Sequence, residues 1–263
     1  MKLWISIDAS IVRLGARFLE SWKQVLIFLR FTLEMFLSLP SVFNNFHIAV
    51  EQMYLIGITS VPLVALTSIF TGAVAAWQAA YNFADYVPLR YVGTAVGKSV
   101  MLEVGPVLTA LVVSGRVGAA MTAELGTMAV TEQLDAMKVL NLNPFRFLMA
   151  PRLFAAMIML PMLTIFSSLI AILGALAVVT IFKGLSPESF WYGVRLFYTN
   201  WDMFVGILKS FVFGIIISLF GCYYGYTSTH GAEGVGRATM ASVVAANVSV
   251  LISGFLISNF LLR

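Results

Sequence analysis

Three long stretches of this sequence contain no charged side chain, and they restrict the chain to few kinds of fold. Asp, Glu, Lys and Arg are absent between Glu51 and Asp85, between Arg152 and Lys183, and between Arg237 and Arg263. A helix that crosses the hydrocarbon core of a bilayer needs about 20 mostly apolar residues. Each stretch is long enough, so we predict a membrane-spanning helix in each of them.

Two further predicted spans contain a few charges. One runs from about Met203 to Tyr226 and includes Lys209. The other runs from about Val92 to Leu125 and carries Lys98, Glu103 and Arg116. Only 11% of the 263 residues are charged, whereas a soluble globular chain has about 25%. We therefore predict an all-α integral membrane protein with five transmembrane helices.

The first forty residues have a different pattern. Lys23, Arg30, Glu34 and Ser38 fall on one helical stripe, and apolar residues cover the rest of the surface. A helix of this kind lies in the membrane interface, and Pro40 is expected to end it. The predicted division is an amphipathic interfacial segment at 1–40 and a transmembrane domain at 41–263.

The positive residues predict the orientation. With the amino terminus in the cytoplasm, ten of the 16 Lys and Arg residues lie inside, four lie outside, and Lys98 and Lys209 lie within spans. The ten are Lys2, Arg13, Arg17, Lys23, Arg30, Arg116, Lys138, Arg146, Arg152 and Arg237. Positive residues concentrate on the cytoplasmic side of membrane proteins. The sequence thus predicts a cytoplasmic amino terminus and an external carboxyl terminus.

Two polar connections are expected to form short helices. The cytoplasmic stretch of about 122–147 includes Glu124, Glu132, Asp135 and Lys138, which suit a surface helix. The external stretch of 183–202 contains Ser186-Pro187-Glu188, a typical helix start.

Enzyme, metal and nucleic-acid functions are not favoured. The segment 93–99 resembles a phosphate-binding loop, but it has three residues between its glycines where the motif needs four. The two histidines, His47 and His230, lack metal-ligand spacing. The basic residues are scattered beside apolar spans, which does not favour nucleic acid. We predict no catalytic residue, no metal site and no cofactor in this chain.

Glu103 and Lys209 are the most informative charges, because each lies well inside a predicted span. Such groups usually face a bundle interior or a wet cavity, and they are often paired. One interpretation is a structural ion pair that joins two spans. The other is a cavity that receives a polar head group. Gly105-Pro106 favours an irregular helix at this point, and both interpretations remain open.

The residues from Glu103 to Ala136 resemble the long motif of the MlaE/YrbE permease family. The matched elements are Glu103-x-Gly105-Pro106, Gly115-Arg116-x-Gly118, Ala123-Glu124-x-Gly126-x-Met128 and Thr131-Glu132-Gln133. Further matches are Gly72, Gln78, Asn143-Pro144, Pro151-Arg152 and Gly236-Arg237-Ala238-Thr239. The resemblance covers the chain from about Glu51 to its end.

This resemblance implies an ABC transporter permease that moves phospholipids or related lipids between the bacterial inner membrane and the outer envelope. It implies a homodimer, a cytoplasmic ATPase that binds the ATP, a periplasmic MCE-domain protein and, in some systems, a STAS-domain partner. The residues implied in ATPase coupling are Glu124, Thr131, Glu132, Gln133 and Asp135. The candidates for the lipid path are Glu103, Lys209, Arg116, Arg237, Trp77 and Gln78.

The sequence departs from the family pattern at two positions. Leu102 stands where many relatives have a basic residue, and Lys98, one turn away, is a candidate substitute. Gly254 stands where many relatives have Asp. An alternative function is a transporter driven by an ion gradient, with Glu103 as the proton site. That alternative predicts inverted repeats, and none is evident in the five spans.

The predicted orientation can be tested by thiol labelling. In a variant without Cys222, a cysteine near Val139 should be shielded from a membrane-impermeant reagent in intact cells. A cysteine near Leu185 should react. The opposite labelling pattern would reverse the topology and the cytoplasmic placement of the loop.

Overall fold

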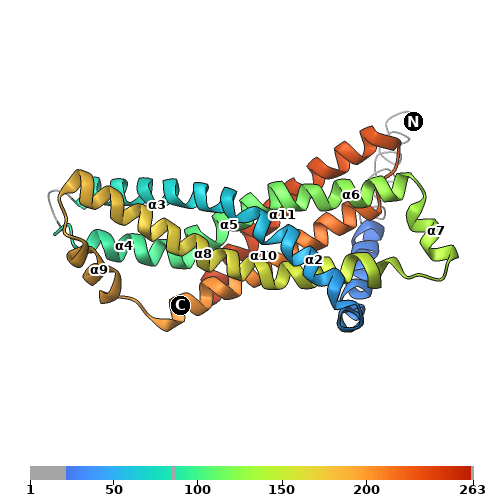
Figure 1. The fold of residues 1–263 in the computed structure, drawn as a ribbon, viewed down its shortest axis with the longest axis horizontal. Coiled ribbons are helices and arrows are strands. Elements are labelled where there is room, and N and C mark those ends of the chain that lie inside the picture. The colour runs from blue at the N-terminus through green and yellow to red at the C-terminus, as the bar shows by residue number, and fades with distance from the viewer. Residues whose placement is uncertain (1–21, 84–86, 262–263) are drawn as a thin grey trace, which may run out of the picture.

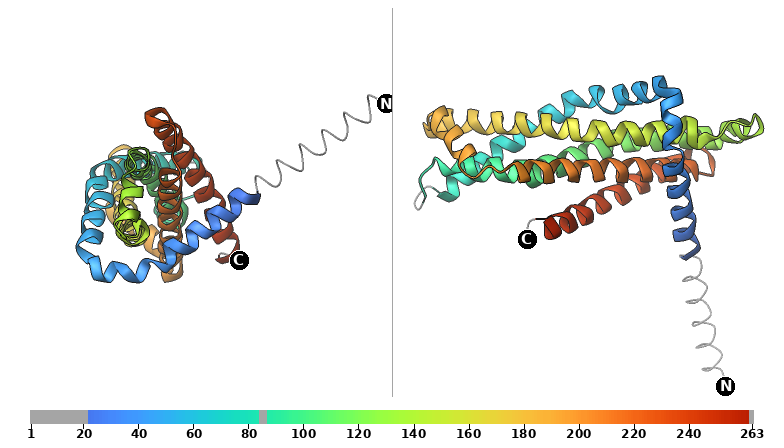
Figure 2. Two further views of the ribbon diagram at one scale, coloured as in Figure 1. Left: turned by 90° about the vertical axis from the view of Figure 1, so that its right-hand side faces the viewer. Right: turned by 90° about the horizontal axis from the view of Figure 1, so that it is seen from below.

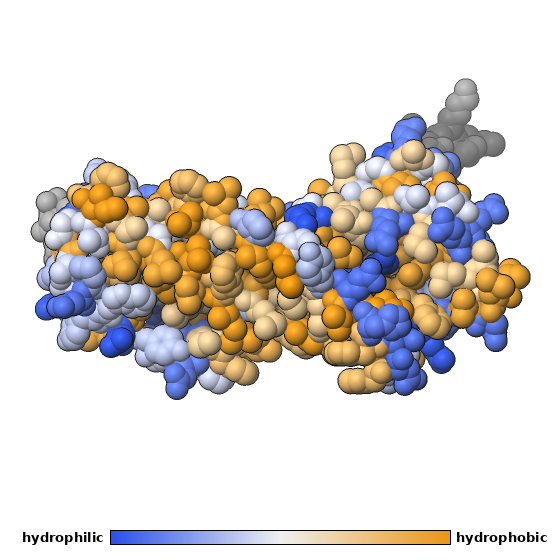
Figure 3. Space-filling model, viewed as in Figure 1, coloured by the Kyte–Doolittle hydropathy of each residue, from blue (hydrophilic) through white to orange (hydrophobic). Residues whose placement is uncertain are grey.

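The computed structural model describes residues 22–83 and 87–261. Within these residues, five helical segments are long and apolar enough to cross a membrane: Leu39–Phe83, Tyr91–Val130, Phe145–Lys183, Asn200–Tyr226 and Gly231–Leu261. They run largely along the long axis of the molecule (Figure 1). Apolar residues cover most of the visible face between the ends (Figure 3). The predicted five-span helical fold is confirmed.

Each of the first three spans is built from several helical pieces. The first comprises η1 (Leu39–Asn45), α2 (Phe46–Ile56), η2 (Ile58–Ser60) and α3 (Val61–Phe83). The second comprises α4 (Tyr91–Ser99), η3 (Val100–Val104), α5 (Gly105–Val113), η4 (Ser114–Gly118) and α6 (Ala119–Val130). The third comprises η5 (Phe145–Met149) and α8 (Ala150–Lys183), and the last two spans are α10 (Asn200–Tyr226) and α11 (Gly231–Leu261). The segments η3, η4 and η5 are π-helical turns.

The second span is longer than the sequence predicted. Helix α6 continues to Val130, so the first part of the predicted loop at 122–147 is helical. The exposed carboxylate of Glu124 does not interrupt the helix, because a helix can project beyond the hydrocarbon core. The short helix within the connection is α7 (Gln133–Val139).

Short helices lie at opposite ends of the bundle. Helix α7 lies at one end, and α9 (Pro187–Leu196) lies at the other (Figure 1). Ser186 caps α9, since its hydroxyl accepts a hydrogen bond from the backbone N–H of Ser189. Both predicted connecting helices are therefore present.

A helix over 22–37 precedes the spans and projects sideways from the bundle (Figure 2). Its residues Phe31 and Met35 are buried in a cluster that includes Phe145 and Leu153. It ends before Pro40, as predicted. The first part of the predicted amphipathic segment, residues 1–21, lies outside the described residues.

Helices α3 and α8 pack closely because small residues face each other. A Cβ at Gly72 would overlap the carbonyl oxygen of Ala171, and a Cβ at Gly174 would overlap that of Ile69. One turn away from Gly72, the hydroxyls of Ser68 and Ser167 are 2.8 Å apart and hydrogen bonded. Small residues allow this approach in membranes, where apolar burial gives no drive toward helix association.

This packing predicts a large effect of one added methyl group. Gly72→Ala should lower the melting temperature of the purified protein, because overpacking costs about 1–3 kcal/mol. The matched control is Gly236→Ala in α11, where nothing lies within 4 Å of the added Cβ. The control should be neutral or slightly stabilising, since Ala favours a helix over Gly by up to about 1 kcal/mol. Equal melting temperatures for the two variants would contradict the close contact.

Candidate functional site

The side chain of Lys209 on α10 is fully buried and makes two polar contacts with the second span. Its Nζ donates to Oε1 of Glu103 at 2.5 Å and to the carbonyl oxygen of Leu102 at 2.9 Å. The Glu103 side chain remains 46% exposed. The contact predicted between the two charges is present, and one side of the carboxylate stays accessible.

A third helix completes the cluster. Ser258 on α11 donates its hydroxyl to the same oxygen of Glu103 at 2.5 Å. This hydroxyl also lies 2.9 Å from the carbonyl oxygen of Gly254, one turn earlier on its own helix. We call Glu103, Lys209 and Ser258 the polar cluster. It joins the second, fourth and fifth spans inside an apolar bundle.

The local sequence explains why a backbone carbonyl is free for Lys209. Pro106 has no N–H, so it cannot donate to the carbonyl of Leu102, four residues earlier. The π-helical turn η3 lies directly before Gly105, and the Lys209 ammonium takes the free carbonyl. Gly105 is required because a Cβ there would overlap the hydroxyl of Ser168 on α8. The Gly-Pro pair thus positions Glu103 and supplies a second acceptor.

The two departures from the family pattern have different outcomes. Lys98 does not replace the basic residue missing at Leu102, because its nearest acidic partner is Asp202, at 3.7 Å. Asp202 is buried and attracts the ammonium group away from Glu103. At Gly254, a Cβ would lie 3.3 Å from the ring of Phe213, and Ser258 provides the polar contact from this helix.

The other candidates for the lipid path lie apart from the polar cluster. Arg116 is exposed and donates to the hydroxyl of Ser60 at 2.7 Å. Arg237 pairs with Glu233 at 3.7 Å on the surface of α11. It lies 21 residues before Ser258, which is about 30 Å along a helix. The sequence alone could not show that these charges are separate.

Trp77 and Gln78 are both exposed on α3. The Trp77 ring packs edge-to-face on Phe182, with centroids 5.8 Å apart, and Lys183 lies over it at 4.8 Å. The contacts of Trp77 are thus with the end of α8.

Four of the five coupling candidates lie together at the α7 end. Glu132 has a left-handed backbone, with φ of 59°, and reverses the chain after α6. Gln133 donates to the hydroxyl of Thr131 at 3.0 Å. Asp135 pairs with Lys138 at 2.8 Å, and this hydrogen bond raises the pKa of Lys138 above its ordinary value.

Glu124 is the exception among these candidates. It lies on α6, and its carboxylate pairs with Arg152 on α8 at 2.7 Å. Arg152 is almost completely buried, and its Nε and Nη1 have no hydrogen-bond partner within the described residues. From the sequence, Arg152 was expected on the cytoplasmic side and matched the family pattern with Pro151, but its pairing with Glu124 was not predicted. Its position just after Pro151 at the start of α8 was the available signal.

The structure defines a five-span helical membrane protein with an inter-span polar cluster and an exposed helix at one end. The model of the family described as Permease MlaE matches residues 49–260. A probable ABC transporter permease protein of Synechocystis is 39% identical over 241 residues, covering 91% of this chain and 92% of the relative. A probable ABC transporter permease protein of Rickettsia prowazekii is 36% identical, covering 89% and 91%.

A third relative carries a more specific name. The intermembrane phospholipid transport system permease protein MlaE of Haemophilus influenzae is 33% identical over 83% of this chain and 84% of its own length. The chain belongs to the MlaE permease family. It is an ABC transporter permease, a transport component without catalytic chemistry whose ATPase is a separate partner. Membership favours this function over the ion-gradient alternative.

The polar cluster allows a test that separates fold from function. Glu103→Gln should leave Lys209 buried without a counter-charge and lower the unfolding free energy, by up to about 3–5 kcal/mol for a buried pair. Adding Lys209→Met should restore most of it. We expect both variants to retain less co-purified phospholipid, since the exposed side of the carboxylate is lost in each.

Thermal melts and lipid counts on the same samples give the two readouts. Thr239→Val, which removes a hydroxyl bonded only within α11, is the control and should change neither. A double variant that keeps its full lipid complement and transports normally would remove both residues from the substrate path.

Proposed function

We propose that this permease moves phospholipids or related lipids between the inner membrane and the outer envelope of a bacterium. The observation that carries the proposal is the half-exposed carboxylate of Glu103 within apolar spans, held by Lys209 and Ser258. A transported lipid needs an apolar wall for its chains and a polar contact for its head group. The name of the Haemophilus influenzae relative supports phospholipid as the substrate class.

The assembly proposed around the chain follows the family resemblance. Two copies form a homodimer, one ATPase binds each copy from the cytoplasm, and an MCE-domain protein receives or delivers lipid in the periplasm. A STAS-domain protein is a further proposed partner. The lipid occupies an outward-facing cavity near the first and second spans. The domain at 41–263 acts as one permease unit, and the segment at 1–40 lies in the interface.

The exposed end of the molecule supports the ATPase contact. Val139 and Leu140 follow the polar part of α7 and are 87% and 71% exposed. They lie between the second and third spans, outside both. Apolar side chains so exposed suit a protein interface. We therefore place the coupling contact at 131–140, while Glu124 acts from the surface of α6 through its pair with the buried Arg152.

Charge reversal at Glu132 tests this contact. Glu132→Lys should reduce the amount of ATPase that co-purifies in mild detergent, because it places the opposite charge at the interface. The permease should still insert and melt normally, since the side chain is exposed. Glu188→Lys, a reversal at the opposite end on α9, is the matched control and should retain the ATPase.

The same purification tests the wider proposal, because mass spectrometry identifies the co-purifying chains and lipids. Normal ATPase yield and normal lipid-stimulated ATP hydrolysis in Glu132→Lys would contradict the coupling contact. Purified wild-type complex that contains no phospholipid and no MCE-domain chain would contradict the proposed transport function.

A further inference from the structure

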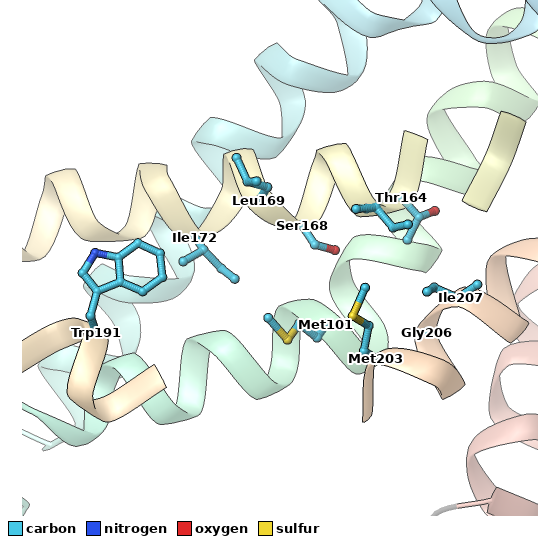
Figure 4. Close-up of a pocket in the computed structure, with 10 residues that line it drawn as sticks. Met101, Thr164, Ser168, Leu169, Ile172, Trp191, Met203, Gly206 and Ile207 are labelled. Atoms are coloured by element: carbon cyan, nitrogen blue, oxygen red, sulfur yellow. The ribbon is translucent and has the colours of Figure 1, made fainter. Parts of the chain in front are cut away.

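A narrow apolar cleft opens on the side of the bundle, away from the polar cluster. It has a volume of about 250 Å³ and lies between α8 and α10, with walls also from η3 and α9 (Figure 4). Its lining is mostly aliphatic and includes Met101, Ile165, Leu169, Ile172, Met203 and Ile207. Met101 and Glu103 are two residues apart on η3, and Glu103 reaches Lys209 and Ser258 instead.

The cleft runs lengthwise along the third span. Its α8 residues extend from Thr164 to Ile172, which is about 12 Å of helix. Trp191 on α9 lies at one end of it (Figure 4). One leaflet of a bilayer contributes about 15 Å of hydrocarbon. The cleft therefore has the length and direction of an acyl chain in the leaflet at the α9 end.

The size and the walls of the cleft favour a hydrocarbon chain as its occupant. A cavity with aliphatic walls does not hold water well. A partner helix with its side chains is about 10–12 Å wide, which is too wide to lie between α8 and α10 in this cleft. A single unbranched hydrocarbon chain is much thinner, and it is the group that surrounds this span in a bilayer.

A second pocket, with a more polar lining, shares Trp191 with the cleft. Its other lining residues are Pro187, Glu188, Tyr192 and Arg195. Trp and Tyr concentrate at the level of the lipid head groups, and Arg binds phosphate through paired hydrogen bonds. Neither Glu188 nor Arg195 forms an ion pair within 4 Å in the part of the chain that the structure describes. Both charges are thus free to contact a zwitterionic head group.

We propose that the cleft and this pocket bind one phospholipid of the surrounding bilayer, at a site separate from the transport path. One acyl chain lies along α8 in the cleft. The phosphate contacts Arg195, and the ammonium group of a phosphatidylethanolamine contacts Glu188. The bound lipid packs against the back of η3 and so supports the segment that positions Glu103.

Photolabelling in defined vesicles tests the site. The full chain is reconstituted in phosphatidylethanolamine and phosphatidylglycerol, with a fraction of phosphatidylethanolamine that carries a diazirine in the middle of one acyl chain. After irradiation, adducts should concentrate on peptides that contain 164–172 and 203–207. Leu169→Trp, which fills the cleft, should reduce the number of adducts by about tenfold. This is the loss of affinity expected when the lipid loses apolar contact equal to about one buried side chain.

Matched variants separate the site from ordinary bilayer contact. Leu173 lies one turn beyond Leu169 on α8 and is also exposed, but it does not line the cleft. Leu173→Trp should leave the adducts unchanged. Arg195→Gln should reduce them by about threefold, in the range of a surface charge interaction. Arg90→Gln, another exposed arginine at the same end, should not.

Three outcomes would overturn the proposal. The first is equal labelling of the wild type and Leu169→Trp. The second is labelling spread evenly along the exposed face of α8. A benzophenone side chain introduced at position 169 of the assembled transporter should capture lipid. The third contradicting outcome is that this side chain captures a polypeptide instead. None of these outcomes alters ATPase binding or transport through Glu103, so the two proposals fail independently.

Discussion

The buried ammonium group of Lys209 is the constraint on which the centre of the bundle depends. A lysine at the middle of a membrane span costs about 2.5–3.5 kcal/mol on insertion scales, and here its side chain is completely buried. The structure offsets this cost with the Glu103 carboxylate and the Leu102 carbonyl. The carbonyl is free because Pro106 cannot donate to it. The close approach also requires Gly206, where a Cβ would overlap the carbonyl oxygen of Met101.

In the rest of the bundle, the helix backbones must also lie close together. In lipid, helices gain little from hiding apolar surface, so packing and interhelical hydrogen bonds must join them. At the α6 end, the buried Thr122 hydroxyl lies within 3.1 Å of the carbonyl oxygen of Gly221 and 2.9 Å of the Ser242 hydroxyl. One small polar side chain thus links the second, fourth and fifth spans, as the polar cluster does at another level. Two such junctions fix these three spans relative to one another.

The number of spans could be predicted from the sequence because long charge-free stretches have few other folds. The ends of the spans could not be predicted, because helices continue past the hydrocarbon core and include charged residues there. Glu51 lies in α2 and Glu124 lies in α6. The Glu103–Lys209 contact could be anticipated, since two isolated charges in apolar spans need partners. The contact of Ser258 could not, because a Ser or Thr hydroxyl within a helix can bond instead to the carbonyl four residues earlier on its own helix.

The sequence also did not predict the positions and ion-pair partners of Lys98 and Arg152. Lys98 was a candidate substitute for the basic residue absent at Leu102, and it pairs instead with Asp202, the last residue of the predicted external connection. Arg152 lay just outside a predicted span, yet the structure buries it. Its burial follows from tertiary packing at the η5–α8 junction, and its position just after Pro151 was the one local signal. These positions depend on which helices become neighbours, and composition gives no information on that choice.

Under the proposed function, ATP-driven motion must pass from α7 to Glu103 over a considerable distance. Glu103 and Val130 are 27 residues apart in one helical segment, which is about 40 Å. That segment contains the π-helical turns η3 and η4, where the regular hydrogen-bond ladder is interrupted and bending costs less. Arg116 lies in η4 and Glu103 lies in η3. Both charged lipid-path candidates of this span are therefore at positions where the helix bends more easily. A rotation begun at α7 would therefore be absorbed at η4 or passed to η3, depending on how firmly the Glu124–Arg152 pair and the Thr122 junction hold α6 to its neighbours.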